Sequence, residues 1–462
     1  MADLQPMFKL VIRNTLKSDI LKIYDNEREK VLKMTDKNGS RMAITTDLWT
    51  LSNKKRGFIV ITVHFIDHTW TLQSRVLRFV YVPSSYTKDV LVEVLVDCFL
   101  EWNINRKLST ITVDNCSTND AMIRLFLNKL DTSSFMFGRS MLQMRCAAHI
   151  LNLIVQDELP LIGDGIKRIR DSVIYWTGSP KRRQQFEENA RQLRVQCTKE
   201  LVLDCKTHWN STYLILSTAL IYKDVFLHLA KRETFYTCLP YDYDWKLAKD
   251  ICGRLKLFHS VTEFFSGRKY SITNIVVMAV AAILDPRYKM KLLEFYYPNI
   301  YGDNSDLEIE KIKKLCYNLL DEYGDIDESL VDNEGSSHIP ASTSSPVAQM
   351  KFSSSSSKKH ESARMEFNHF IDEGVLKRSK DFDILGWWKS NDLKYPTLQR
   401  ITRDILAIPV TTVASESAFS TSGRLLSPHR SSTMSGNCTL QLILDDGESN
   451  EEDESCVTIV DD

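Results

Sequence analysis

The stretch Ala43-Ile-Thr-Thr-Asp-Leu-Trp-Thr50 begins the part of the chain whose pattern decides the fold. It is dominated by β-branched and aromatic residues, as are the runs 57–66 and 72–81 that follow it, and such runs are typical of strands. A helix-like run over 88–102 then leads to a short strand candidate over 109–113. Three antiparallel strands, a crossover helix and a parallel strand predict an α/β fold with a mixed sheet flanked by helices.

Three acidic residues, far apart in the chain, each lie in a distinctive local sequence. Asp47 lies in the first expected strand, Asp114 follows the fourth in Ile111-Thr-Val-Asp-Asn115, and Glu416 lies in Val413-Ala-Ser-Glu-Ser417. Two rigid carboxylates joined by a third from a helix could bind divalent metal ions such as Mg²⁺ or Mn²⁺, and leave positions for a phosphate and a water. Each aspartate alone is more often a turn or helix-cap residue.

A series of short segments, taken together, resembles a known family. Each segment is weakly informative, but their joint order is highly specific. The segments are Thr46-Asp-Leu-Trp49, Thr112-Val-Asp-Asn115, Arg145-Cys-Ala-Ala-His-Ile-Leu-Asn-Leu153, Thr207-His-Trp-Asn-Ser-Thr-Tyr213, Leu284-Asp-Pro-Arg-Tyr-Lys289 and Ala414-Ser-Glu-Ser-Ala-Phe-Ser420. With them, the chain resembles the hAT superfamily of transposases, and within it the plant transposon-derived proteins described as zinc finger BED domain-containing and Ricesleeper-like. The match covers most of the chain.

The resemblance implies a ribonuclease-H-like catalytic fold interrupted by a helical insertion, with a C-terminal hAT-type helical dimerisation region. It implies that Asp47, Asp114 and Glu416 are both the catalytic residues and the metal ligands of a DDE-type enzyme that cleaves and transfers DNA strands. It also implies two partners, DNA and a second subunit, which is either the same chain or a full-length relative. The implied location is the nucleus.

Cys146 and His149 lie three positions apart at the start of an apolar helical stretch. They could share a zinc ion, but a structural zinc site needs four ligands and no second pair follows at a useful distance. Zinc is therefore not expected. By resemblance, the two residues form the family's Cys-x-x-His element, which packs beside the active site and shapes it.

Trp209 stands among polar residues, which is unusual for a core tryptophan. The resemblance implies that it holds a flipped base, in keeping with aromatic stacking on extruded bases, and a buried tryptophan is the alternative. His208 replaces the arginine usual in the family, so we expect weaker phosphate binding. Lys181, Arg182 and Arg183 could also contact phosphate, although a solvated helix face is the more ordinary interpretation.

Composition limits these interpretations. A formal net charge of −1 over 462 residues does not favour a protein that coats DNA through its overall charge. The longest apolar run, 275–284, is about half of what a membrane span needs, and the N-terminus lacks a signal pattern, so we expect a soluble intracellular protein with no membrane partner. The 10 cysteines are scattered singly, which predicts reduced thiols.

A dense set of large apolar side chains lies in the C-terminal part of the sequence. Such a set must be covered by the core or by another chain. The family resemblance favours a dimer interface, and packing within the chain is the alternative. The candidate interface residues are Trp387, Trp388, Ile401, Ile405, Leu406 and Phe419.

The chain is expected to have six segments. Its linker is rich in Ser, Asp and Glu and lacks periodic apolar residues, which is typical of disorder. The segments are an N-terminal helical segment packed on the core (1–40), the first part of the ribonuclease-H-like core (41–230), a shortened helical insertion (231–323), a disordered linker (324–365), the dimerisation region carrying the third acid (366–436) and an acidic tail (437–462).

Three hypotheses about function follow. No Cys-x-x-Cys with a His pair precedes the sheet, so a BED finger is not expected, and the tail is acidic where the family has a tryptophan-containing helix. These departures favour a domesticated or decayed nuclear protein that binds DNA and dimerises, with vestigial catalysis. The retained acids favour the alternative, an active metal-dependent DNA transposase. The third hypothesis is a protein-interaction scaffold without DNA contact, so enzymatic activity stays open.

Overall fold

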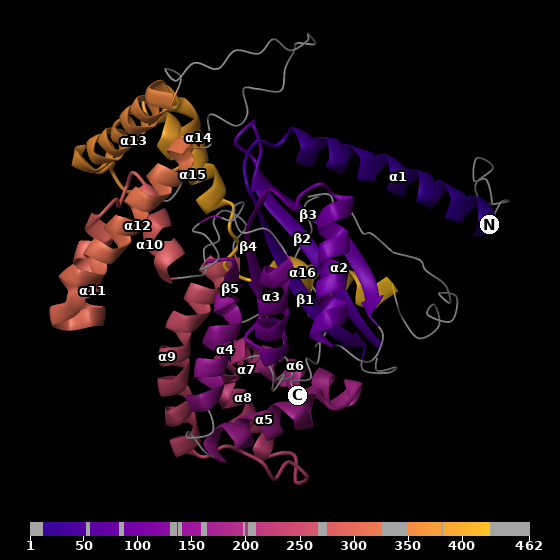
Figure 1. The fold of residues 1–462 in the computed structure, drawn as a ribbon. Helices are drawn as coiled ribbons and strands as arrows, with labels where there is room; N and C mark the ends of the chain where they lie inside the picture. The colour runs from indigo at the N-terminus through magenta and orange to yellow at the C-terminus, as the bar shows by residue number, and fades with distance from the viewer. Residues whose placement is uncertain are drawn as a thin grey trace. The chain divides into compact units, whose positions relative to one another are not determined.

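The structure is a computed structural model, and its described residues fall into two compact units (Figure 1). The first unit is built from residues up to 146 and again from 275, and the second from 147–266. The described residues are 13–51, 56–82, 87–129, 136, 141–158, 164–196, 199–201, 209–266, 275–325, 349–379 and 382–425.

A five-stranded mixed sheet forms the centre of the first unit, in the order β3-β2-β1-β4-β5. β1 pairs antiparallel with β2 and parallel with β4. The α/β fold class and the four expected strands are confirmed, while β5 was not predicted because three residues are too few to show an alternating pattern. The strands are β1 (Met42–Leu51), β2 (Arg56–Ile66), β3 (Leu72–Val82), β4 (Leu108–Val113) and β5 (Gln143–Arg145).

The two faces of the sheet bury different side chains because successive residues of a strand point to opposite faces. From β2, Ile59, Ile61 and Val63 enter an apolar core with α2 (Lys88–Glu101) and α3 (Ser117–Lys129). The opposite face carries α16 (Val413–Leu425), which packs on β1, β2 and β3. Figure 1 shows α2 and α3 in front of the sheet and α16 behind it.

The expected N-terminal helix is present as α1 (Arg13–Lys37), and residues 1–12 lie outside the described part of the chain. Its second half packs on the sheet core through Val31. The expectation that the whole stretch packs on the core is wrong for its first half, because Ile20 and Ile23 are exposed. Irregular spacing of these apolar residues gives no continuous stripe that the core could bury.

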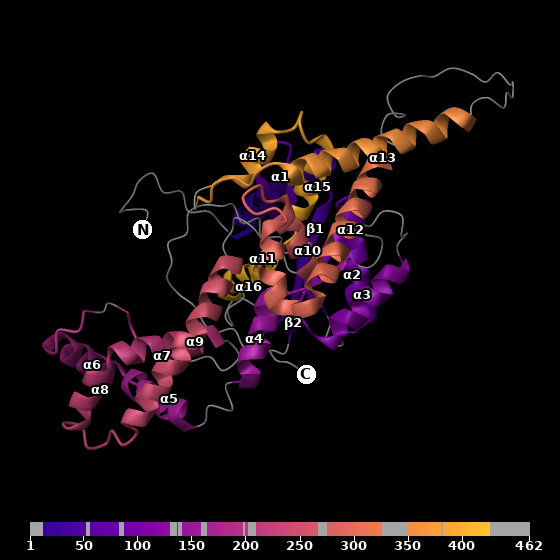
Figure 2. The ribbon, with the colours of Figure 1, turned by 90° about the vertical axis from the view of Figure 1, so that its left-hand side faces the viewer.

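A bundle of helices completes the first unit, with α12 and α13 packed side by side (Figure 2). Its apolar core also takes in residues from the sheet, among them Ala43 and Ile66. The helices are α10 (Ile275–Leu284), α11 (Lys291–Tyr301), the 3-10 turn η3 (Gly302–Asn304), α12 (Ser305–Asp325), α13 (Gln349–Asp372), α14 (Ile384–Ser390) and α15 (Pro396–Leu406).

Helix α13 corrects the expected linker over 324–365. Part of that range, 326–348, lies outside the described residues, but the helix begins at Gln349 and continues beyond the expected boundary. Serine is a modest helix former, so the composition suggested disorder. Apolar residues at helical spacing nevertheless bury one side of the helix, namely Ala363, Phe367 and Phe370.

The second unit is helical throughout its described residues, with a core that includes Trp176, Phe186 and Phe226. It begins at Ala147, directly after β5, so the expected boundary between the core and the helical insertion at 230 is wrong. The apolar runs of this segment are long and helical, and its described residues contain no strand after β5. Its helices are α4 (Ala147–Glu158), α5 (Asp164–Thr177), α6 (Pro180–Gln192), α7 (Trp209–Ile221), α8 (Lys223–Ala230) and α9 (Asp242–Ser266).

A search of the described helices for membrane spans finds no single helix of sufficient length and apolarity. Residues 211–221 and 223–230 are long and apolar enough only when the two helices are taken together, and the pair is bent by 65°. Buried side chains of this pair, such as Leu216 and Phe226, belong to the apolar core of the second unit.

Candidate functional site

Asp47 lies in the middle of β1, on the face of the sheet that α16 covers. Its Oδ1 accepts a hydrogen bond from the backbone N–H of Leu48 at 2.8 Å. Burial first, and then the negative charges of Glu416 and Asp114, raise the pKa of Asp47 well above its usual range. The structure therefore brings Asp114 and Glu416 close enough to Asp47 for their charges to act on it.

Asp114 directly follows β4, the strand that pairs in parallel with β1. The side-chain amide of Asn119, a nearly buried residue in the first turns of α3, donates a hydrogen bond to Asp114 Oδ1. Cys116 lies between Asp114 and Asn119 in the sequence. Burial, and then the charge of Asp114, raises the pKa of its thiol to about 11. The thiol is therefore protonated at neutral pH, and the carboxylate is held by an amide.

Glu416 lies in the first turn of α16. Its Oε1 accepts a hydrogen bond from the hydroxyl of Thr412 at 3.0 Å, and the carbonyl of Thr412 accepts the backbone N–H of Glu416 at 3.0 Å. Further along the helix, the ring of Phe419 stacks on Trp49 of β1 with centroids 5.7 Å apart. The ring contact holds α16 against the strand that carries Asp47, and the bonds to Thr412 order the first turn of the helix.

Several polar residues next to the acids were missed by the sequence argument. Thr45, His64 and Ser415 form a buried hydrogen-bonded group beside Glu416, and Thr412 holds its carboxylate. For Thr412 a signal existed, because a threonine just before a helix is a preferred cap. For Thr45 and His64 there was none, since only the tertiary packing of α16 reveals their contacts.

The chemistry of the donor set suits a hard divalent cation. Three carboxylates supply only oxygen ligands, and a cation would offset the repulsion that raises the pKa of Asp47. In the described part of the chain, however, no three His, Cys, Asp or Glu side chains already converge on a position that could hold a metal ion. The carboxylates are therefore neighbours that must draw together to ligate one ion.

Cys146 and His149 have different environments. Cys146 is buried at the end of β5, its N–H donates to Val113 O at 2.8 Å, and its sulfur lies 3.4 Å from the hydroxyl of Thr412. It thus packs beside the residue that holds Glu416, as the Cys-x-x-His resemblance implied. His149 is a partly buried residue of α4, in the second unit.

The predicted DNA-binding residues are placed only in part. His208 and the side chain of Trp209 lie outside the described part of the chain, although Trp209 is the first residue of α7. Lys181 is exposed on α6, and the Arg182 guanidinium stacks over the ring of Tyr175 at 4.0 Å.

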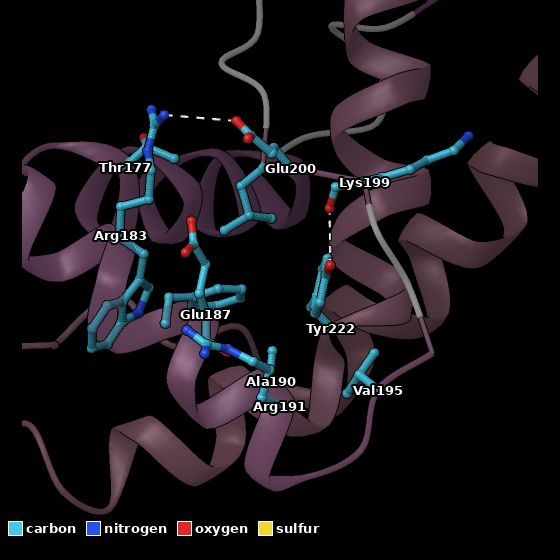
Figure 3. Close-up of a pocket in the computed structure, with 12 residues that line it drawn as sticks. Thr177, Arg183, Glu187, Ala190, Arg191, Val195, Lys199, Glu200 and Tyr222 are labelled. Atoms are coloured by element: carbon cyan, nitrogen blue, oxygen red, sulfur yellow. Dashed lines mark hydrogen bonds and ion pairs between the residues drawn. The ribbon is translucent and has the colours of Figure 1, made fainter.

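Arg183 lines a pocket of about 330 Å³ in the second unit (Figure 3). Its guanidinium lies 3.7 Å from the carboxylate of Glu200, across the mouth of the pocket in Figure 3. Both side chains are more than half exposed, so the ion pair is weak. Of the basic run, Lys181 is thus the residue that makes no ion pair or ring contact with a described side chain, and Arg183 shares its charge with an acid.

The residues expected to form a dimer interface are mostly core residues of their own chain. Trp388 is fully buried and its indole N–H donates to Leu284 O at 3.0 Å, while Trp387 is half-buried. The expectation that this set forms an exposed association surface is therefore wrong, because α10, α12 and the sheet already cover it. The buried members are Trp388, Ile401, Ile405, Leu406 and Phe419.

The mixed sheet with acids on adjacent parallel strands and a third acid on a C-terminal helix defines a ribonuclease-H-like class of protein. Comparison with family models agrees. The chain matches a ZBED1 RNase-like domain over 45–142, a ZBED1 RNase-like helical domain over 144–254, a hAT-like transposase RNase-H fold over 249–323 and a hAT family C-terminal dimerisation region over 366–446.

Curated relatives narrow the class to one family. The chain is 31% identical to zinc finger BED domain-containing protein RICESLEEPER 2 of Oryza sativa subsp. japonica, over 93% of this chain and 68% of the relative. RICESLEEPER 1 of the same organism is 32% identical with the same coverage. A putative AC transposase of Zea mays is 30% identical over 92% of this chain and 59% of its own length. The chain belongs to the hAT family of transposases and transposase-derived proteins.

Proposed function

We propose that the chain is a transposase-derived nuclear protein that binds DNA, associates through its C-terminal region and binds Mg²⁺ or Mn²⁺ at Asp47, Asp114 and Glu416. The observation that carries the proposal is the placement of the acids: Asp47 lies on β1, Asp114 follows the adjacent parallel strand β4, and Glu416 lies on α16, which covers β1. They are 67 and 302 positions apart in the sequence, and the charges of Asp114 and Glu416 help to raise the pKa of Asp47. Such a charge arrangement is costly in a fold unless a cation offsets it.

The roles of the residues follow from their contacts. A divalent cation supplies a positive charge that binds a phosphate oxygen and lowers the pKa of a bound water. Asn119 holds the Asp114 carboxylate, and Thr412 holds the Glu416 carboxylate. Asp47 accepts the N–H of Leu48, and its pKa is the one that the other two acids raise, so it should be the acid most affected by a cation.

DNA binding is supported by family membership and by exposed basic residues such as Lys181. The formal net charge of −1 means that local cations must provide the phosphate contacts, so binding should be weak, steeply salt-dependent and poorly selective. Fluorescence anisotropy of labelled duplexes across a salt series tests this. A strong preference for one duplex at physiological salt would contradict it, and no binding at low salt would favour a protein-interaction scaffold.

Self-association is supported by the match of 366–446 to a dimerisation region. Because the large apolar residues expected to form the interface are buried, other residues of this region must make the contact. Leu393, between α14 and α15, is 96% exposed, and Val375 is 49% exposed. We infer that a second copy of the chain, or a full-length relative, covers these side chains.

A second candidate function is DNA strand cleavage, favoured by the hydrogen bonds that hold two of the acids in place. A vestigial site would have no need of them. A nicking assay with Mn²⁺ on supercoiled DNA separates the two candidates: nicking by the wild type that is lost in Glu416→Gln would establish cleavage. Metal binding without nicking would support the binding function and contradict strand cleavage.

A further inference from the structure

A buried chain of hydrogen bonds runs from α16 into the sheet. The hydroxyl of Ser415 donates to Thr45 Oγ1 at 3.0 Å, and Thr45 Oγ1 lies 3.0 Å from His64 Nε2. Ser415 and Thr45 are fully buried and His64 is 6% exposed. This series of hydrogen bonds thus joins α16, β1 and β2 in the interior of the first unit.

The direction of the last hydrogen bond depends on the tautomer of His64. Thr45 Oγ1 accepts from Ser415 and has one proton of its own, so it either donates to His64 Nε2 or accepts a second hydrogen bond from the Nε2–H. Burial lowers the pKa of His64 to about 3, so the ring is neutral at ordinary pH in either arrangement.

A second chain of hydrogen bonds begins at Thr412, four residues before Glu416. The Thr412 hydroxyl lies 3.0 Å from Glu416 Oε1 and 3.4 Å from Cys146 Sγ. It can donate its single proton to one of them, and a carboxylate is the stronger acceptor. The Thr412 N–H also points at the sulfur, at 3.5 Å, so β5 anchors the residue that holds the acid.

The two series of hydrogen bonds fix the position of α16 on the sheet more precisely than its apolar contacts can. The ring of Phe419 packs on Trp49 and Phe79, and aromatic stacking tolerates small shifts of one element on another. Hydrogen bonds between short side chains do not tolerate such shifts, because they weaken steeply with distance and angle. Thr412 and Ser415, which both precede Glu416, are therefore the residues that fix its position along β1.

We propose that Thr45, Thr412 and Ser415 are positioning residues that fix the register of α16 on the sheet, so that Glu416 faces Asp47. The inference rests on the proposed metal site, which gives that register its function. In the absence of metal the same hydrogen bonds keep the first turn of α16 ordered. Neither the motif around Glu416 nor the acid itself shows this role, since the partners come from β1, β2 and β5.

The experiment compares Thr412→Val, Thr412→Ser and Thr45→Val with the wild-type protein. Serine retains the hydroxyl and valine removes it with little change in shape. The matched control is Thr402→Val, because Thr402 is fully buried on α15 and its hydroxyl has no partner in the described part of the chain. The first readout is amide hydrogen exchange of 413–425 without metal, and the second is Mn²⁺ affinity by calorimetry.

We expect both valine variants to speed exchange in the first turn of α16 and to weaken Mn²⁺ binding, in Thr412→Val by about tenfold or more, the equivalent of one hydrogen bond to a charged group. Thr412→Ser and Thr402→Val should match the wild type in both measurements. Unchanged exchange and affinity in Thr412→Val would overturn the inference. So would an equal loss in Thr402→Val, which would show a general packing effect.

The two readouts also separate this inference from the proposed function. If the wild type binds no Mn²⁺, the metal site is wrong, but exchange in the metal-free protein still tests whether the hydroxyls hold α16. If the wild type binds Mn²⁺ and the valine variants bind it equally well, the site stands and the positioning role of the hydroxyls is wrong.

Discussion

At the scale of the single residue, Asp47 combines two conditions that disfavour its charged form, a largely enclosed position and two neighbouring acids. Its folded-state pKa is raised above the unfolded value, so ionising it costs folding free energy. The stability associated with protonated Asp47 is present at low pH and is lost as the pH rises through the folded-state pKa. A divalent cation acts in the opposite direction, because it favours the ionised carboxylate.

The first prediction concerns Asp47→Asn in metal-free protein. Asparagine can still accept the N–H of Leu48 but carries no charge, so the variant should unfold at a higher temperature than the wild type at neutral pH. Each kcal/mol gained corresponds to about 2–4 °C for a domain of this size. Calorimetric scans in EDTA from pH 5 to pH 8 measure the unfolding temperatures of the variant and the wild type. Equal melting temperatures at pH 8 would contradict the assigned repulsion.

The sequence predicted the three acids of the site but not the residues that hold them. Local motifs identify Asp47, Asp114 and Glu416 because each lies in a distinctive run of neighbours. Thr45 and His64 lie in an ordinary strand pattern, and they become partners of α16 only through packing across a gap of hundreds of residues. Contacts of that kind leave no local pattern.

At the scale of the element, one buried acid joins β1, α12 and α15. Asp404 Oδ1 accepts the backbone N–H of Arg41 at 2.8 Å, and its other oxygen accepts the hydroxyl of Tyr323. Asp404 is 3% exposed, and burial raises its pKa. Arg41 also pairs with Glu322 at 2.7 Å, so the start of β1 is tied to both helices.

The second prediction is that Asp404→Ala destabilises the first unit, because it leaves two buried donors, the N–H of Arg41 and the Tyr323 hydroxyl, without an acceptor. Each such donor costs about 1–3 kcal/mol. Asp404→Asn keeps an acceptor and should cost much less. Urea unfolding followed by tryptophan fluorescence measures both variants. Equal losses in the two would show that the charge, and not the acceptor, is what matters.

The elements themselves were predictable where they are long and regular. The strands of 57–66 and 72–81 alternate over many residues, and the structure confirms them as β2 and β3. The boundary of the helical unit and the helix α13 were not predicted. The serine-rich stretch has few apolar residues and so suggested a linker, while Phe367 and Phe370 lie beyond its expected boundary. Its helix becomes visible once α12 is known to pack against α13.

At the scale of the whole molecule, the C-terminal region completes the core of the first unit and also belongs to a stretch that matches a dimerisation region. Its large aromatic residues serve the core, as Trp388 and Tyr395 are fully buried. The proposed self-association would therefore use exposed residues such as Leu393 and leave the core unchanged.

The third prediction is that Leu393→Ser weakens self-association without lowering the unfolding temperature, since the side chain is 96% exposed in the single chain. The matched control is Leu307→Ser, an exposed leucine of α12 outside the matched dimerisation region. Light scattering over a concentration series up to tens of micromolar measures both. A wild type that remains monomeric throughout, or an equal effect of the two variants, would contradict the assigned surface.

Calorimetric titration with Mn²⁺ tests the central claim, that three distant acids form one divalent-metal site, most directly. The comparison uses the wild type, Asp114→Asn and the matched control Asp97→Asn, an exposed acid of α2. We predict that the wild type and Asp97→Asn bind Mn²⁺ with the same affinity and that Asp114→Asn does not bind it measurably. Unchanged binding in Asp114→Asn, or no binding by the wild type, would contradict the assignment of the site.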